Sequence, residues 1–167
     1  MSANFELAEL PSPLGTLLAV CDGAGALRAL DFADCEPRLR RLLRAPVRPG
    51  RVPEPVAESL GAYFAGELSA LESLVTHTGG TEFQRRVWAA LRQIPAGATT
   101  TYAALARAID RPSACRAVGL ANGQNPLAIV VPCHRVIGSS GALTGYAGGL
   151  ERKRWLLDHE RRWSPKT

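Results

Sequence analysis

The sequence lacks a long hydrophobic run and a basic leader. None of its apolar runs approaches the roughly 18 residues that a transmembrane helix needs. The opening stretch MSANFELAELPSP carries acidic residues and no basic region, which argues against a signal peptide. We therefore expect a cytoplasmic protein that makes no use of a membrane.

Paired cysteines are also missing, because none of the four cysteines belongs to a C-x-x-C motif. Without a secretory context, a disulfide framework is not expected. Cys21, Cys35 and His77 are conceivable metal ligands, but their spacing matches no zinc pattern. Small buried hydrophobic side chains explain both cysteines better, so we expect no metal and no cofactor.

Lysine is absent from the first 79 residues, and the excess positive charge lies elsewhere. Residues 1–79 hold 7 Arg against 10 acidic residues, a net charge of −3. Residues 80–167 hold 13 Lys and Arg against 5 acidic residues, a net charge of +8. A basic half indicates a polyanion such as nucleic acid, although a solvated arginine-rich face has the same composition. The change of charge, together with two glycines at 79 and 80, predicts two domains, 1–79 and 80–167.

The first domain is predicted to be a small sheet with helices. Apolar runs at 15–23 and 26–34 flank the turn DGAG and predict a β-hairpin. Residues 37–44 predict a short helix, 45–55 a proline-rich connecting loop, and 56–68 a second helix.

The second domain is predicted to be mostly helical, which makes the fold class α/β (α+β). Thr81 and Gln84 form a capping box for one helix. TTTYAALARAI begins another, and ACRAVGLANG is a third that ends at Gly123. The last two, joined by DRPS, match a helix-turn-helix, although any helical hairpin has this pattern. The third helix has small side chains and one charge, Arg116, which suits close packing on DNA and equally on a protein core.

The stretch LAIVVPCHRV carries the candidate nucleophile. Its apolar residues before Pro132 predict a buried strand that ends at the proline. A cysteine attacks as a thiolate, and its usual pKa of about 8.5 leaves little of it ionised at neutral pH. A histidine that takes the proton solves this. Cys133 and His134 would point to opposite faces of a straight strand, so their cooperation requires a bend or a bridging water.

The histidine needs a carboxylate that fixes its tautomer, and helical geometry chooses between two. Leu156 and Leu157 should face inward, and Glu160 lies four and three residues after them on the same face. Asp158 is turned by roughly 200° from Leu156. The spacing predicts Glu160 as the inward partner of His134, with a solvated helix end as the alternative, and it leaves His159 exposed.

The residues between these two groups, GSSGALTGYAGG at 138–149, include five glycines. They lack the lysine that follows the glycine frame of a phosphate-binding P-loop, which excludes that motif. The stretch predicts a mobile or tightly folded loop beside the cysteine, in which Tyr146 can form a wall against a planar ligand.

The motifs IVVPCHRVIG, GYAGG and WLLDHE, with TTYAALA and CRAVGLANGQNP, resemble the O6-alkylguanine-DNA alkyltransferases. The likeness is dense over residues 80–160 and looser at SPLGTLLAV and YFAGEL. It implies irreversible, stoichiometric transfer of an alkyl group from O6-alkylguanine, and from O4-alkylthymine, to Cys133. The implied partner is double-stranded DNA with alkylated bases, and the protein is implied to be a monomer with no obligatory protein partner.

The resemblance also implies a role for each matching residue. His134 would deprotonate Cys133 through a water, Glu160 would orient His134, Asn125 would brace the turn, and Tyr102 would help to protonate the departing guanine. Arg116 would fill the gap that the flipped base leaves in the duplex. The other implied DNA contacts are Thr101, Ala114, Ala117, Ala121 and Arg135, and the implied guanine pocket is formed by Val136, Tyr146, Ala147 and Gly148.

Three other functions compete with this one. A non-enzymatic reader of alkylated DNA would replace the cysteine, which is present here. A helix-turn-helix transcription factor would leave Cys133, His134 and Glu160 without a role. A cysteine hydrolase would turn over repeatedly.

Overall fold

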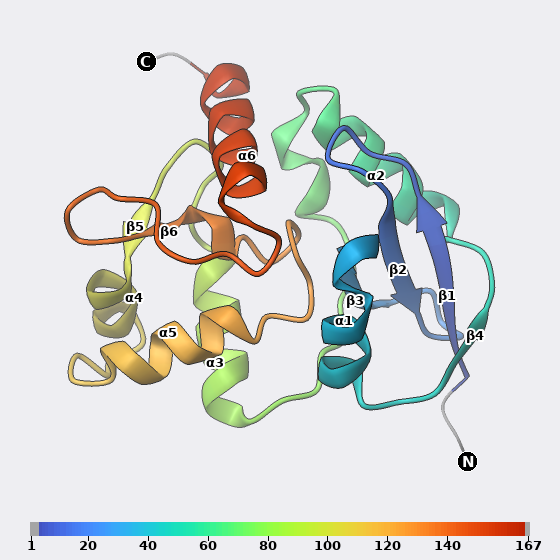
Figure 1. The fold of residues 1–167 in the computed structure, drawn as a ribbon, viewed down its shortest axis with the longest axis horizontal. Coiled ribbons are helices and arrows are strands. Elements are labelled where there is room, and N and C mark those ends of the chain that lie inside the picture. The colour runs from blue at the N-terminus through green and yellow to red at the C-terminus, as the bar shows by residue number, and fades with distance from the viewer. Residues whose placement is uncertain (1–3, 166–167) are drawn as a thin grey trace. The chain divides into compact units, whose positions relative to one another are not determined.

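The computed structural model describes residues 4–165, which fold into two compact units (Figure 1). The first unit runs to Gly79 and also takes Pro126–Ala128, and the second comprises Gly80–Asn125 and the chain from Ile129 onwards. Within residues 4–165, no helix has the length and apolar character needed to cross a membrane.

A four-stranded sheet forms the centre of the first unit. The strands are β1 (Phe5–Leu10), β2 (Leu17–Cys21), β3 (Leu27–Phe32) and β4 (Val47–Pro49), in the order β3-β2-β1-β4. β2 pairs antiparallel with both neighbours, and β4 pairs parallel with β1. The predicted hairpin is β2–β3, and the Asp22 carboxylate stabilises its turn by accepting from the backbone N–H groups of Ala24 and Ala26.

Two α-helices and two short 3₁₀ helices, η1 (Ala33–Cys35) and η2 (Leu68–Leu71), accompany this sheet. α1 (Glu36–Leu43) and α2 (Glu54–Phe64) lie where helices were predicted. The proline-rich stretch 45–55 was predicted to contain no regular element, but it includes β4. A three-residue edge strand can end in Pro49 because an edge position tolerates a missing N–H donor.

The second unit is mostly helical, and the fold class is confirmed as mixed α/β with a small N-terminal sheet. α3 (Glu82–Leu91) begins with the predicted capping box at Thr81. α4 (Tyr102–Ala108) and α5 (Cys115–Gly123) form the predicted helical hairpin, and α6 (Leu150–Trp163) follows the glycine-rich loop. Two short parallel strands, β5 (Thr100–Thr101) and β6 (Val136–Ile137), join the start of α4 to the chain after the cysteine.

The buried strand predicted before Pro132 is absent. Residues 127–131 are all buried, but residues 128–130 form a turn, and Ile129 has a φ of 72°. Leu127 makes one isolated bridge to Leu30. An apolar run predicts that a segment is buried, whereas a strand also requires a neighbouring strand to pair with along its length. The change of backbone direction at Ile129 prevents such pairing in this segment.

Candidate active site

Cys133 lies in a tight turn and not at the end of a strand. It begins the short 3₁₀ helix η3 (Cys133–Arg135), after Pro132 leaves the extended conformation. With about three residues per turn, adjacent side chains of such a helix diverge by about 120° and not by the 180° of a strand. The turn is therefore the bend that cooperation between Cys133 and His134 requires. Cys133 is 7% exposed.

Asn125 is hydrogen-bonded to the backbone that leads into this turn. Its side chain is buried, and its amide Nδ2 donates a 2.8 Å hydrogen bond to the carbonyl of Val131, two residues before the cysteine. The backbone N–H of Cys133 donates to the same carbonyl. The Val131 carbonyl thus ties the end of α5 to the cysteine turn.

His134 and Glu160 are in contact and fully buried. His134 Nε2 and Glu160 Oε2 are 2.8 Å apart, and neither side chain is exposed to solvent. Glu160 projects from α6 on the same face as Leu156 and Leu157, which are also buried. The inward orientation predicted from helical spacing is present in the structure.

Arg135 is the third member of this buried group, and the DNA contact predicted for it would require its side chain to leave these partners. Its Nε donates to Glu160 Oε1 at 2.7 Å and its Nη2 to Glu160 Oε2 at 2.8 Å. Its Nη1 donates to the carbonyl of Ile94. The residue is 8% exposed, so its guanidinium is unavailable to a phosphate. A buried carboxylate needs a cation, and this requirement was the signal for Arg135 in the sequence.

The charges in this group follow from its contacts. Burial favours a raised pKa for Glu160, but the contacts with His134 and Arg135 outweigh it and hold that pKa well below its usual value. Burial lowers the pKa of His134, although Glu160 opposes this effect. The imidazole is therefore neutral at neutral pH, and its hydrogen bond together with the contacts of Arg135 keeps Glu160 ionised.

An ionised Glu160 fixes the tautomer of His134. Because the carboxylate can only accept, Nε2 must carry the proton and donate it, which leaves the lone pair on Nδ1. Among residues 4–165, Nδ1 is buried and has no hydrogen-bond partner. The arrangement thus presents an oriented, neutral imidazole with one basic nitrogen available.

Lys153 is a buried functional candidate that sequence reasoning missed. Its side chain is fully buried, and Nζ donates to the carbonyls of Val136 at 2.6 Å and Thr144 at 2.7 Å. Burial lowers the pKa of its ammonium, and proximity to Cys133 opposes that shift. Lys153 precedes Leu156 and Leu157 by three and four residues, so the spacing that identified Glu160 also placed Lys153 inward.

One prediction for α6 is wrong. His159 was expected to be exposed, but its exposed fraction is only 8%. Its ring stacks on Trp155, one turn earlier, with centroids 4.8 Å apart. Position 159 follows Leu156 by three residues, so it belongs to the same buried stripe.

Tyr102 and Thr101 lie at the start of α4. The hydroxyl of Thr101 accepts from the N–H of Ala104 and caps the helix. Tyr102 Oη is 3.1 Å from Thr144 Oγ1 in the glycine-rich loop. A side chain at Gly119 of α5 would reach within 3.7 Å of the Tyr102 ring, so Tyr102 stands between α5 and the loop.

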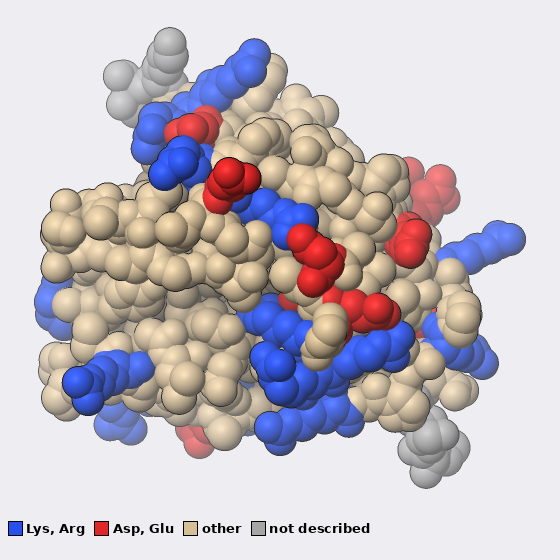
Figure 2. All heavy atoms as spheres, in the orientation of Figure 1, with Lys and Arg blue, Asp and Glu red and all other residues tan. Residues whose placement is uncertain are grey.

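The predicted pocket residues follow the cysteine turn. Val136 is fully buried and pairs with Thr100 in the β5–β6 ladder. Tyr146 and Gly148 are half-buried and Ala147 is exposed. Figure 2 shows the surface hollowed between α5 and the loop of residues 138–149.

The predicted DNA-contacting residues divide between two faces of α5. Arg116 and Ala117 are exposed and Ala114 is half-buried. Ala121 is buried, and its carbonyl accepts from Trp88 Nε1 at 2.9 Å, which leaves it little surface for the predicted DNA contact. It lies five residues after Arg116, which turns it toward α3. Leu120, which was not predicted, is 64% exposed and lies one turn after Arg116.

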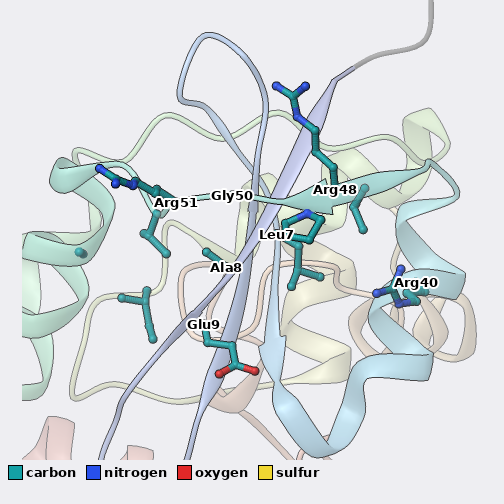
Figure 3. Close-up of a pocket in the computed structure, with 12 residues that line it drawn as sticks. Leu7, Ala8, Glu9, Arg40, Arg48, Gly50 and Arg51 are labelled. Carbon is teal, nitrogen blue, oxygen red and sulfur yellow. The ribbon is translucent and has the colours of Figure 1, made fainter.

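The first unit contains a separate groove of 740 Å³ beside β1 and β4 (Figure 3). Among its basic lining residues, Arg40 and Arg48 are paired with Glu36 and Glu6. All its lining residues belong to the first unit, and none is a predicted site residue. Within residues 4–165, no three His, Cys, Asp or Glu side chains are grouped so as to hold a metal ion.

Known proteins resemble both the sequence and the fold. The family described as "6-O-methylguanine DNA methyltransferase, DNA binding domain" matches residues 82–162. The methylated-DNA–protein-cysteine methyltransferase of Salmonella typhimurium is 49% identical over 159 residues, which are 91% of this chain and 93% of that protein. The crystal structure of Mycobacterium tuberculosis O6-methylguanine methyltransferase is 43% identical, with a TM-score of 0.82 over 98% of this chain and 96% of that one. A structure of Mycobacterium tuberculosis OGT in complex with DNA also has a TM-score of 0.82, at 43% identity over 97% of this chain and 95% of that one.

Proposed function

The chain belongs to the methylated-DNA–protein-cysteine methyltransferase family, and from that premise we propose that Cys133 is the residue that accepts the alkyl group. The protein repairs DNA by direct reversal, in which an alkyl group passes from a damaged base to a cysteine. The observation that carries the assignment of Cys133 is the buried group beside it. His134 is oriented by Glu160 and Arg135, and its Nδ1 is left with a lone pair.

We propose the following sequence of events at the site. His134 Nδ1 takes the thiol proton of Cys133 through a water molecule, and Glu160 stabilises the imidazolium that forms. The sulfur attacks the alkyl carbon while the bond from that carbon to O6 breaks and its electron pair stays with the guanine. The guanine takes up a proton with the help of Tyr102, and the imidazolium returns its proton to water. The product is a thioether, so each molecule acts once.

DNA is the partner, and the base must leave the helix to react. An alkyl carbon inside a duplex cannot line up with a sulfur, and extruding the base costs a few kcal/mol. We propose that Arg116 enters the gap and that Ala114 and Ala117 allow α5 to approach the minor groove closely. The basic second half of the chain adds affinity for phosphates without regard to base sequence.

The remaining assignments complete the proposal. Val136, Tyr146, Ala147 and Gly148 form the pocket for the flipped base, which takes O6-alkylguanine and also O4-alkylthymine. The first and second units correspond to an N-terminal domain and a catalytic DNA-binding domain. The protein acts as a monomer without an obligatory protein partner, and it acts in the cytoplasm, where Cys133 stays reduced.

The direct test is to incubate the protein with duplex DNA that contains O6-methylguanine and then to measure the intact mass of the protein by mass spectrometry. We expect one methylene of added mass per molecule, located by peptide mapping on Cys133. Cys133→Ser should gain nothing, whereas Cys115→Ser, which changes an exposed cysteine, should react like the wild type. Repeated turnover would instead indicate a hydrolase, and DNA binding without added mass would indicate a reader.

A further inference from the structure

The phenol of Tyr102 is hydrogen-bonded to a residue that the sequence does not single out. Tyr102 Oη and Thr144 Oγ1 are 3.1 Å apart in a half-buried setting, and either oxygen can be the donor. Tyr102 begins α4, whereas Thr144 follows it by 42 residues, in the loop between β6 and α6. This contact therefore joins two separate walls of the candidate site.

Thr144 is itself held firmly from its backbone side. Its carbonyl accepts a 2.7 Å hydrogen bond from Lys153 Nζ, and the same ammonium donates to the carbonyl of Val136. Lys153 is fully buried, and a buried ammonium retains these bonds because breaking one leaves a charge without compensation. Lys153 thus connects α6, β6 and the loop at one point, through the backbone of Thr144.

The loop around Thr144 is ordered by further contacts. Gly138 donates to the carbonyl of Ala142, and Gly141 donates to the carbonyl of Gly138. The Thr144 methyl carbon lies 3.1 Å from the place where a Cβ on Gly138 would stand, so the Thr144 side chain packs against this turn. The hydroxyl therefore has little freedom to point away from Tyr102.

We propose that Thr144 is a positioning residue for the Tyr102 phenol and that Lys153 anchors it. The proposal deepens the function proposed above and rests on it, because it assumes that Tyr102 protonates the departing base. A threonine hydroxyl has one proton to donate and lone pairs to accept. It can accept from the phenol before the reaction and donate to the phenol oxygen as that oxygen gives up its proton.

The step balances in protons and electrons. As the carbon–sulfur bond forms, the electron pair of the carbon–O6 bond remains on the guanine, and the Tyr102 hydroxyl transfers its proton to that anion. Tyr102 is left as a phenolate, which the Thr144 hydroxyl stabilises with one hydrogen bond. The phenolate then takes a proton from water, and the proton that Cys133 gave to His134 goes back to water.

The test is a double-mutant cycle measured by single-turnover methyl transfer from duplex O6-methylguanine DNA to Cys133. Thr144→Val keeps the shape but removes the hydroxyl, and it should slow transfer about five- to ten-fold, as one lost hydrogen bond would. Thr144→Ser should restore the wild-type rate. In a Tyr102→Phe background, Thr144→Val should cause no further loss, because interacting residues give non-additive effects.

Controls separate positioning from general damage. Thr99→Val changes an exposed threonine of the same unit that is outside the network, and it should leave the rate unchanged. Equal losses from Thr144→Val with and without Tyr102, or no loss at all, would overturn this inference while the proposed function stood. A wild-type protein that gained no methyl group on Cys133 would overturn the proposed function, and the inference with it.

Discussion

The two units differ most in what they bury. The described part of the first unit buries one charged residue, Asp31, whereas that of the second buries His134, Arg135, Lys153, His159 and Glu160, with two asparagines. The core of the first unit is formed by apolar residues of the sheet and α1, such as Leu18, Val20 and Leu39. Burying charge costs free energy that apolar packing does not. The second unit therefore gives up stability to hold a reactive arrangement, and the first unit does not.

The two buried carboxylates show the same contrast in detail. Asp31 is paired with Arg38 at 2.7 Å and accepts from the Phe32 backbone N–H at 2.9 Å, yet burial, helped by the nearby Asp34, raises its pKa because these contacts do not fully compensate. Glu160 has two bonds from Arg135 and one from His134, and its pKa is held well below the usual value despite burial. The contacts therefore outweigh burial at Glu160 but not at Asp31, and the pKa values of the two acids shift in opposite directions.

The largest effect on stability is expected when the arginine that pairs with each buried carboxylate is replaced. Arg135→Met leaves a buried charge unpaired and should cost about 3–5 kcal/mol of unfolding free energy. Arg38→Met should cost less, because Asp31, whose pKa is already raised, can take up a proton. Hydrogen exchange in urea, read by mass spectrometry from peptides of α6 and of β2, measures both. Equal losses of unfolding free energy in the two variants would show that the two ion pairs contribute equally to stability, which would contradict this prediction.

Changing a buried ionisable group in each unit separates chemistry from stability. His134→Gln keeps a donor for Glu160 but has no basic nitrogen, and it should slow methyl transfer on the order of 100-fold. Asp31→Asn should leave the transfer rate unchanged, because Asp31 lies outside the site. Quenched single-turnover reactions followed by mass measurement provide both rates. A His134→Gln protein at full speed would remove His134 from its proposed role.

Replacing one exposed arginine in each unit tests which unit contacts DNA during the reaction. Arg116→Ala should slow reaction with duplex DNA about ten-fold, as expected for the loss of one protruding contact, and should leave reaction with free O6-methylguanine base unchanged. Arg48→Ala, on an exposed arginine of the first unit, should change neither rate. Equal losses on duplex and free base would contradict a role for Arg116 in the DNA.

Acid provides the mildest test. The pKa values of His134 and Glu160 are lowered on folding, so their contribution to stability is present above their unfolded pKa values and is lost as the pH falls. The loss should begin near the unfolded histidine pKa of about 6.5 and deepen near the glutamate value of about 4.3. Asp31 has a raised pKa, so its protonation stabilises the folded state of the first unit as the pH falls. Hydrogen exchange at several pH values should show protection falling in α6 before it falls in β2.

Sequence reasoning succeeded where one periodicity or one local rule decided the outcome. The capping box at Thr81, the β2–β3 hairpin and the inward face of Glu160 each follow from residues a few positions apart. Lys153 and His159 satisfy the same spacing as Glu160. They were missed because residue type suggested solvent, and only their partners, backbone carbonyls for one and Trp155 for the other, explain their burial.

Other features depend on contacts that no local pattern contains. The segment before Pro132 is buried by parts of the chain far away in sequence, so its apolar character did not reveal that it turns at Ile129. Arg135 is held by Glu160, 25 residues later, and Tyr102 meets Thr144 across 42 residues. Such pairings are set by tertiary structure, and a single sequence offers only the residue types from which to choose.

The bond from Trp88 to α5 has a practical consequence. All three tryptophans lie beyond residue 80, and the indole N–H of Trp88 donates to the Ala121 carbonyl in the helix that carries Arg116. Indole emission responds to its immediate surroundings, so a displacement of α5 when DNA docks would alter the intrinsic fluorescence. The protein thus contains its own optical reporter of docking, and Trp155 and Trp163 are the other two indoles that contribute to this emission.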